Sequence, residues 1–165
     1  MPRNAFELGL AALTILKNKL GENVQIYSAG SEWDPYEYGM GGILKNLGKL
    51  PYSTLPRFYS SMDCGLMFMF SGHPGVVASE LMASGCPVVV NEYEDKTWNS
   101  LYINDKTCIV STPTAAIIAH NIERALTDAR LRENIIPAAR NKVKEFYGDY
   151  DSSCKEASKS LFLRS

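Results

Sequence analysis

The sequence has no apolar run near the roughly 20 residues that a helix needs to cross a bilayer. Its first residues, MPRNAFELG, have neither the hydrophobic core nor the cleavage pattern of a secretory signal peptide. A cytoplasmic location is therefore the expectation.

The sequence also has no excess of charge of one sign. Its 17 basic and 18 acidic side chains leave a formal net charge of -1. Such a chain exerts no long-range attraction on nucleic acid, so no nucleic-acid partner is expected. Its 165 residues are enough for one domain with a core of its own, and we predict a single domain over residues 1–165.

The four cysteines form no CxxC pair, which argues against a zinc site. Cys64, Cys86 and Cys108 follow one another at intervals of 22 residues near the starts of three apolar runs, and Cys154 lies in a polar C-terminal segment. This spacing indicates a repeated unit of strand and crossover, and the cysteines are expected to be reduced, structural thiols.

The spacing of apolar residues predicts helices that alternate with strands. The expected helices cover 4–20, 53–62, 76–85, 113–129 and 131–147, and the expected strands cover 24–29, 43–47, 66–70, 86–90 and 107–110. This order favours the α/β class, with a Rossmann-like parallel sheet and helices on both faces. Asn4 and Thr112 are the predicted N-caps of the first and fourth helices, and Pro137 is expected to break or kink the last one.

The stretch over 66–90, LMFMFSGHPGVVASELMASGCPVVV, predicts a strand, a polar turn over 71–75, a helix and a second strand. The turn lies at the carboxyl end of a parallel strand, where open α/β sheets place their ligands. A glycine-containing turn before a helix N-terminus suits a phosphate group. His73 offers a hydrogen-bond donor at the rim, although a surface histidine without a role is the more common case.

Glu80 is the unusual residue of the predicted helix, because it lies among apolar neighbours. A carboxylate there needs partners if it is buried, and its two oxygens can accept from the vicinal hydroxyls of a ribose. The alternative, which composition alone favours, is a solvated glutamate. No GxGxxG and no GxxxxGK[ST] motif occurs, which argues against the usual dinucleotide and P-loop sites. The residues by themselves predict a phosphate-and-ribose pocket.

The string SGHPGVVASELMASGCPVVV resembles EGFGxxxxEAMAxGxPVV, the donor-binding motif of GT-B glycosyltransferases of the largely retaining family 4. Glu80 matches the second glutamate and Gly75 the second glycine, while the first glutamate falls on Gly72. His73-Pro74 replaces G-F, and this version is similar to bacterial rhamnosyltransferases that assemble cell-surface glycans. The segment from Leu47-Gly48 to Asp63 also resembles the family's G-x-L and L-x-x-L-Y-x-x-A-D pattern.

The resemblance implies a nucleotide-sugar donor, such as a dTDP- or UDP-sugar, that is bound without a metal ion or another cofactor. The residues implied to hold it are Glu80 (ribose), Gly75 and Val76 (diphosphate, through backbone N–H groups), His73 in the same turn as Ser71 (phosphate or sugar hydroxyl), Gly48 and Leu50 (base), Arg3 (diphosphate), and Asn99 beside Trp98 (the flank of the donor).

The apolar first helix has little sequence before it, which suggests the C-terminal part of a longer enzyme. A preceding strand and an N-terminal acceptor domain would then be absent. That domain is expected to carry the catalytic base, the contact with the glycan acceptor and any peripheral association with a membrane. The 165 residues alone are expected to bind nucleotide without transferring sugar.

Two other interpretations remain open. A nucleotide-sugar 2-epimerase has the same architecture, but it needs catalytic carboxylates and histidine in defined loops. A non-enzymatic, flavodoxin-like binding or receiver module would have an acidic cluster after its first strand and a lysine at the end of a later one.

Overall fold

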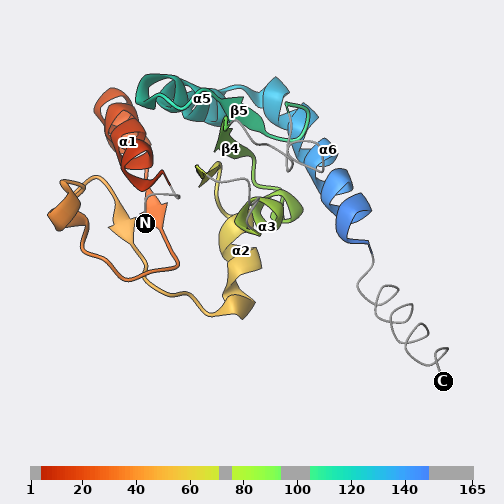
Figure 1. Ribbon diagram of the computed structural model, residues 1–165, viewed down its shortest axis with the longest axis horizontal. Coiled ribbons are helices and arrows are strands. Elements are labelled where there is room, and N and C mark those ends of the chain that lie inside the picture. Colours follow the sequence, from red (N-terminus) through yellow and green to blue (C-terminus); the bar gives the residue numbers. More distant parts are fainter. Residues whose placement is uncertain (1–4, 71–75, 94–104, 149–165) are drawn as a thin grey trace.

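The computed structural model describes residues 5–70, 76–93 and 105–148, and its helices and strands follow the predicted order (Figure 1). The α-helices are α1 (Phe6–Leu20), α2 (Leu55–Ser60), α3 (Val77–Ser84), α5 (Ala115–Thr127) and α6 (Ala129–Tyr147). The strands are β1 (Tyr27–Ser28), β2 (Lys45–Asn46), β3 (Gly65–Met67), β4 (Val88–Asn91) and β5 (Ile109–Ser111). Short 3₁₀ helices cover Gly21–Asn23, Pro35–Tyr38 and Tyr52–Thr54.

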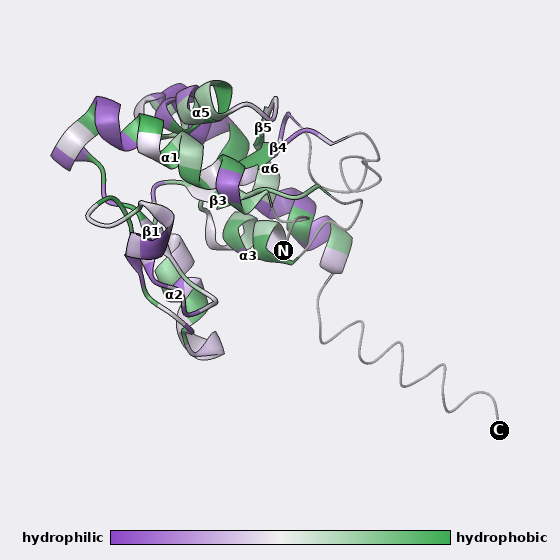
Figure 2. Ribbon diagram, turned by 60° about the vertical axis from the view of Figure 1, so that its left-hand side comes forward, coloured by the Kyte–Doolittle hydropathy of each residue, from purple (hydrophilic) through white to green (hydrophobic). Residues whose placement is uncertain are grey.

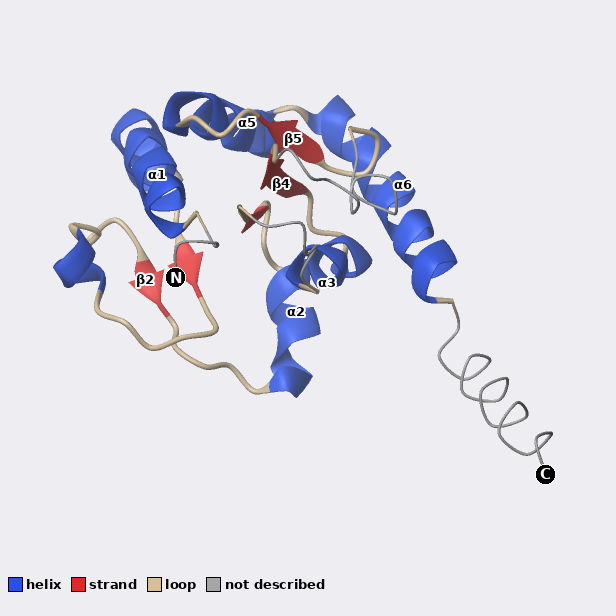
Figure 3. Cartoon of the chain, viewed as in Figure 1, coloured by secondary structure: helices blue, strands red, loops and turns tan. Residues whose placement is uncertain are grey.

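The strands form two parallel sheets rather than one, as Figure 3 shows. The smaller sheet pairs β1 with β2, and the larger has the order β3-β4-β5. In the larger sheet Leu66 pairs with Val89, and Val89 pairs with Ile109. Helix α3 connects β3 to β4, as a parallel pair requires.

Strand β4 is buried on both faces. The side chains of Val88, Val89 and Val90 have no exposed surface. Because side chains alternate along a strand, Val88 and Val90 join a core that includes α3 and α6, whereas Val89 joins a second core that includes α1 and α5. Helices therefore cover both faces of this sheet, which confirms the predicted fold class.

The helices on the outside of these cores are amphipathic. In Figure 2, α1 and α5 carry both hydrophobic and hydrophilic bands, as helices with one buried face do. Helices α1 and α5 also pack against each other, and Lys19 of α1 lies 2.6 Å from Glu123 of α5. Of the helices described, none is long and apolar enough to cross a membrane.

Three predicted helix boundaries need correction or comment. Helix α5 begins after Thr114, not Thr112, and Thr114 makes no side-chain capping bond. The predicted N-cap Asn4 lies outside the described residues, and α1 follows Ala5, which has a left-handed backbone (φ 43°). Helix α6 continues through Pro137, so the predicted break is wrong. Both sides of Pro137 are anchored in a core, by Ile135 and by Ala139, which offsets the lost backbone hydrogen bond.

The cysteines lie where their spacing indicated. Cys64, Cys86 and Cys108 each precede a strand of the three-stranded sheet, and all three are free thiols. Burial raises the pKa of Cys86 to about 12 and also raises that of Cys64, so both stay protonated at neutral pH. Cys154 lies outside the described residues.

Candidate functional site

Four of the residues predicted to form the site lie in the described part of the chain: Gly48, Leu50, Val76 and Glu80. The remaining predicted residues lie outside it, namely Arg3, Ser71, His73, Gly75 and Asn99, as do Gly72, Pro74 and Trp98. The geometry that follows therefore concerns the ribose and base parts of the predicted site and the start of α3.

Helix α3 begins at the predicted anion-binding position. Val76 is its N-cap, and the C=O of Val76 accepts from the N–H of Glu80 at 3.0 Å. The first N–H groups of an α-helix have no partner within the helix and carry the positive end of its dipole. Val76 is 60% exposed and Val77 41% exposed, so the residues at this helix start face solvent.

Glu80 is half-buried on the first turn of α3, and two tyrosine hydroxyls donate to it. The hydroxyl of Tyr52 lies 3.4 Å from its Oε1, and that of Tyr59 lies 3.3 Å from its Oε2. Burial and the nearby carboxylate raise the pKa of Tyr59, so this tyrosine stays protonated and remains a donor. Glu80 is thus neither freely solvated nor sealed in the core.

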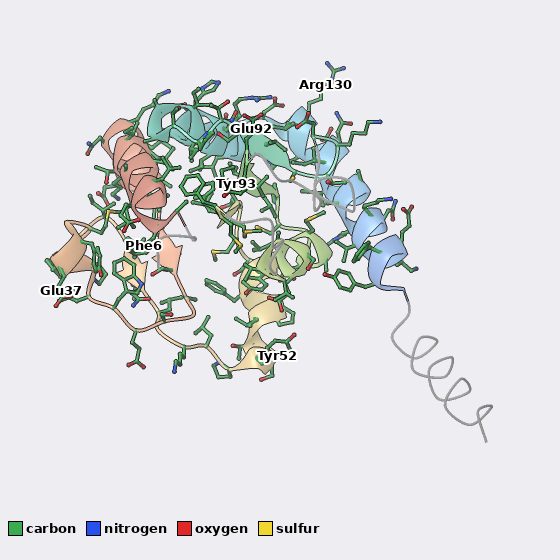
Figure 4. The ribbon with its side chains drawn as sticks, viewed as in Figure 1. Phe6, Glu37, Tyr52, Glu92, Tyr93 and Arg130 are labelled. Carbon is green, nitrogen blue, oxygen red and sulfur yellow. The ribbon has the colours of Figure 1, made fainter. Side chains whose placement is uncertain are left out.

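The Glu80 carboxylate opens into a groove of about 390 Å³ between α2, α3 and α6. The groove is lined by Tyr52, Leu55, Pro56, Tyr59, Glu80, Ala83, Ser84 and Arg140. Figure 4 shows Tyr52 at the outer end of α2. Arg140 donates to the C=O of Ser84 at 3.2 Å and lies over Gly85, which ends α3 in a left-handed conformation (φ 80°). The lining of the groove therefore combines one acidic and one basic side chain with apolar ones.

The turn after β2 holds the two residues predicted to border a base. Gly48 has a left-handed backbone (φ 63°), its N–H donates to Asn46 Oδ1 at 3.2 Å, and its C=O accepts from the N–H of Gly30 at 2.8 Å. Leu50 follows and is half-buried. Because Tyr52 is only two residues further on, this turn and the groove are adjacent along the chain.

The carboxyl end of β4 is fixed by a buried side chain. Asn91 has no exposed surface, and its amide accepts from the N–H of Met69 at 2.7 Å and donates to the C=O of Met69 at 2.9 Å. These bonds continue the pairing of β3 with β4 beyond Met67. Past them, the rings of Phe70 and Tyr93 lie 6.0 Å apart, and Tyr93 lies near the end of β4 in Figure 4.

Sequence reasoning gave no role in the site to Tyr52 or to Arg140, although Ala139-Arg140 resembles the family's closing helices. Tyr59 was matched as part of a motif, but its bond to Glu80 was not foreseen. No local pattern links these residues, because α2, α3 and α6 meet only through tertiary packing. In the part of the chain that the structure describes, no group of three or more metal-ligating side chains is found.

Comparison with known proteins places these features in a family. A family model described as "WsaF, C-terminal domain" matches residues 1–123. The chain is 39% identical over 141 residues to the O-antigen biosynthesis protein RfbC of Myxococcus xanthus, a match that covers 86% of this chain and 11% of that protein. It is 31% identical over 127 residues to an uncharacterized glycosyltransferase of Methanocaldococcus jannaschii, covering 73% of this chain and 30% of that protein.

Solved structures share the fold. The chain superposes on the pneumococcal O-GlcNAc transferase GtfA, solved in complex with UDP and GlcNAc, with a TM-score of 0.76 and 14% identity. That match covers 99% of this chain and 34% of the transferase. The chain thus spans well under half the length of the relatives and of the solved structure that it matches here.

Proposed function

The chain belongs to the WsaF C-terminal domain family, and from this premise we propose that it forms the donor-binding half of a glycosyltransferase of bacterial glycan assembly. Its fold is that of the C-terminal domain of GT-B glycosyltransferases, and its matched relatives include a glycosyltransferase and an O-antigen biosynthesis protein. The donor would be a nucleotide-diphosphate sugar. The acceptor, a growing glycan, would bind to another domain of the full-length protein.

The position of Glu80 carries this proposal. Its carboxylate lies one turn inside a solvent-accessible helix start, on the wall of a groove, with each oxygen already oriented by a tyrosine hydroxyl. A carboxylate has about four acceptor positions, so both oxygens keep the capacity to accept from sugar hydroxyls. The hydroxyls of a ribose, or the 3′-hydroxyl of a deoxyribose, fit this acceptor.

The other roles follow the path of a nucleotide away from Glu80. The diphosphate would lie against the N–H groups of Gly75 and Val76 at the helix start, where the dipole favours an anion. The turn with Ser71 and His73 would contact phosphate or sugar. The base would lie beside Gly48 and Leu50, and Arg3 and Asn99 would close the donor site. Helix end and basic side chains would neutralise the diphosphate without a metal ion.

Rhamnose is the sugar that we propose, since His73-Pro74 in the motif is similar to bacterial rhamnosyltransferases. The Myxococcus relative is named as an O-antigen biosynthesis protein, which supports a cell-surface glycan as the product of the proposed transfer. We propose a cytoplasmic reaction and peripheral membrane association of the full-length enzyme, because a surface glycan is commonly extended on a membrane-bound carrier. A 2-epimerase and a non-enzymatic module have no observation in their favour.

Isothermal titration of the full chain with UDP and with dTDP tests the proposal. At least one of them is expected to bind, and Glu80→Ala is expected to weaken that binding by about tenfold to hundredfold, because hydrogen bonds to a charged group contribute about 1.5–3 kcal/mol. Glu133→Ala, which removes an exposed carboxylate of α6, is the matched control and is expected to bind as the parent does. Absence of binding at millimolar nucleotide, or equal binding by Glu80→Ala, contradicts the proposal.

A further inference from the structure

Asn46, the last residue of β2, uses all the hydrogen-bonding capacity of its side chain. Its Oδ1 accepts from the hydroxyl of Ser28 at 3.0 Å and from the N–H of Gly48 at 3.2 Å. Its Nδ2 donates to the C=O of Ser31 at 3.1 Å and to that of Trp33 at 2.8 Å. An asparagine side chain has two donors and two main acceptor positions, so all four are satisfied.

These four bonds join three segments that the backbone alone joins weakly. The β1–β2 sheet has only two residue pairs, Tyr27 with Lys45 and Ser28 with Asn46. Three backbone bonds connect the two segments: the N–H groups of Lys45, Leu47 and Gly30 donate to the C=O groups of Ile26, Ser28 and Gly48. The side chain of Asn46 adds four bonds at the point where the chain leaves β2, and it is the part of this arrangement that also holds the loop at Ser31 and Trp33.

The turn that Asn46 holds leads to an unused pair of backbone groups. Gly48 is left-handed (φ 63°), a conformation that residues with a side chain rarely adopt, so the turn depends on a glycine at this position. Among residues 5–70, 76–93 and 105–148, nothing hydrogen-bonds to the N–H or the C=O of Leu50. A donor and an acceptor on one residue form the complement of a nucleobase edge, which presents an acceptor beside a donor.

We propose that Asn46 is a positioning residue that sets the nucleobase preference of the donor site. It touches no ligand itself; it fixes the turn over 46–50 so that the Leu50 backbone meets one kind of base edge. This inference rests on the proposed function, because Leu50 borders a base only if the chain binds a nucleotide.

If Asn46 only stabilised the fold, its loss would have a different effect on nucleotide binding than if it positions the turn. Loss of a structural contact weakens the binding of every nucleotide by the same factor, because all of them share the diphosphate and the sugar. Loss of a positioning contact lowers the ratio of two dissociation constants, that of the nucleotide that binds most weakly to that of the nucleotide that binds most tightly. Asn91 is the matched comparison, since it also ends a strand and clamps backbone groups, but it holds Met69 and Glu92 instead of the turn at Gly48.

The experiment measures dissociation constants of UDP, dTDP, ADP and GDP with the full chain and its variants. The parent is expected to prefer one base class. Asn46→Ala is expected to reduce that preference by about tenfold. This is the effect expected when the misplaced Leu50 backbone loses one to two hydrogen bonds to the preferred base. Ser28→Ala removes a single partner of Asn46 and is expected to keep the preference. Asn91→Ala is expected to keep the ratio even where it lowers every affinity.

The outcomes separate this inference from the proposed function. If the parent binds no nucleoside diphosphate, the proposed function fails. If the parent binds but has no base preference, or if Asn46→Ala retains the preference, the inference is overturned while the function stands. If Asn46→Ala does not fold, Asn46→Ser replaces it: its shorter side chain has one hydroxyl in place of the amide and cannot make all four bonds, and it must also lower the preference.

Discussion

The two sheets of this chain are held together in different ways. The three-stranded sheet lies between two hydrophobic cores, and its central strand has no exposed side chain. The two-stranded sheet has paired residues that alternate between exposed and half-buried, and the polar side chain of Asn46 replaces the missing strand pairs. One strand of each sheet ends in an asparagine, but Asn91 is fully buried and Asn46 is half-buried.

This difference separates stability from ligand preference. The groups predicted to grip ribose and diphosphate are carried by α3, whose buried face belongs to the core of the larger sheet. The groups predicted to border the base are carried by a turn with little apolar support. Changes near the larger sheet are therefore expected to affect folding first, and changes near the smaller sheet are expected to affect ligand choice first.

The largest expected effect is a loss of stability at the larger sheet. Met82 of α3 is 1% exposed and packs in the core behind β4. Met82→Ala is expected to lower the free energy of unfolding by about 2–5 kcal/mol, because it removes buried methylene groups and leaves a cavity. Lys45→Ala, on the exposed side of β2, is expected to change it by no more than about 0.5 kcal/mol. Urea denaturation measures both, and equal effects contradict the comparison.

The two strand-ending asparagines are expected to differ by a smaller amount. Asn91→Ala removes the fully buried side chain that pairs the N–H and C=O of the partly buried Met69, which is expected to cost about 2–3 kcal/mol. Asn46→Ala exposes its partners to solvent, and the expected cost is about 1 kcal/mol. Thermal denaturation of both variants tests the order, and a larger loss for Asn46→Ala contradicts it.

A further expected effect is a dependence on alkaline pH that belongs to the larger sheet. The pKa of Cys86 is raised from 9.0 to about 12, so from about pH 9 the thiol ionises in the unfolded chain but not in the folded one. Stability is therefore lost as pH rises from about 9 to 12, by about 3 kcal/mol near pH 11. Cys86→Ala is expected to make this loss shallower.

The slope against pH, not the stability at one pH, is the measurement that matters, because alanine also removes packing. Urea denaturation at about pH 8, 10 and 11 gives that slope. Cys64, whose pKa is raised by the same burial, is expected to keep part of the dependence. An unchanged slope in Cys86→Ala contradicts the assignment. Residues 21–50, which include the smaller sheet, contain no cysteine and contribute nothing to this effect.

Particular residues show where sequence reasoning succeeded and failed. The helix over 6–20 was predicted almost to its limits, because Gly21 ends a regular apolar pattern. The predicted N-cap of α5 and the predicted break at Pro137 were wrong, since α5 begins after Thr114 and two core contacts keep Pro137 in a helix. Glu80 was singled out because an acid among apolar residues is unusual, yet its partners lie on other elements, Tyr52 in a 3₁₀ helix and Tyr59 in α2.

The sequence by itself determined the order of helices and strands, the α/β class and the choice of Glu80, because these depend on periodicity and on residue type within one segment. The tertiary structure alone decided that the strands divide into two sheets, that α2, α3 and α6 enclose a groove, and that Asn46 and Asn91 hold strand ends. These features depend on residues far apart in the sequence, such as Tyr52, Glu80 and Arg140, which line the same groove. Such contacts form through packing of whole elements, which local patterns do not encode.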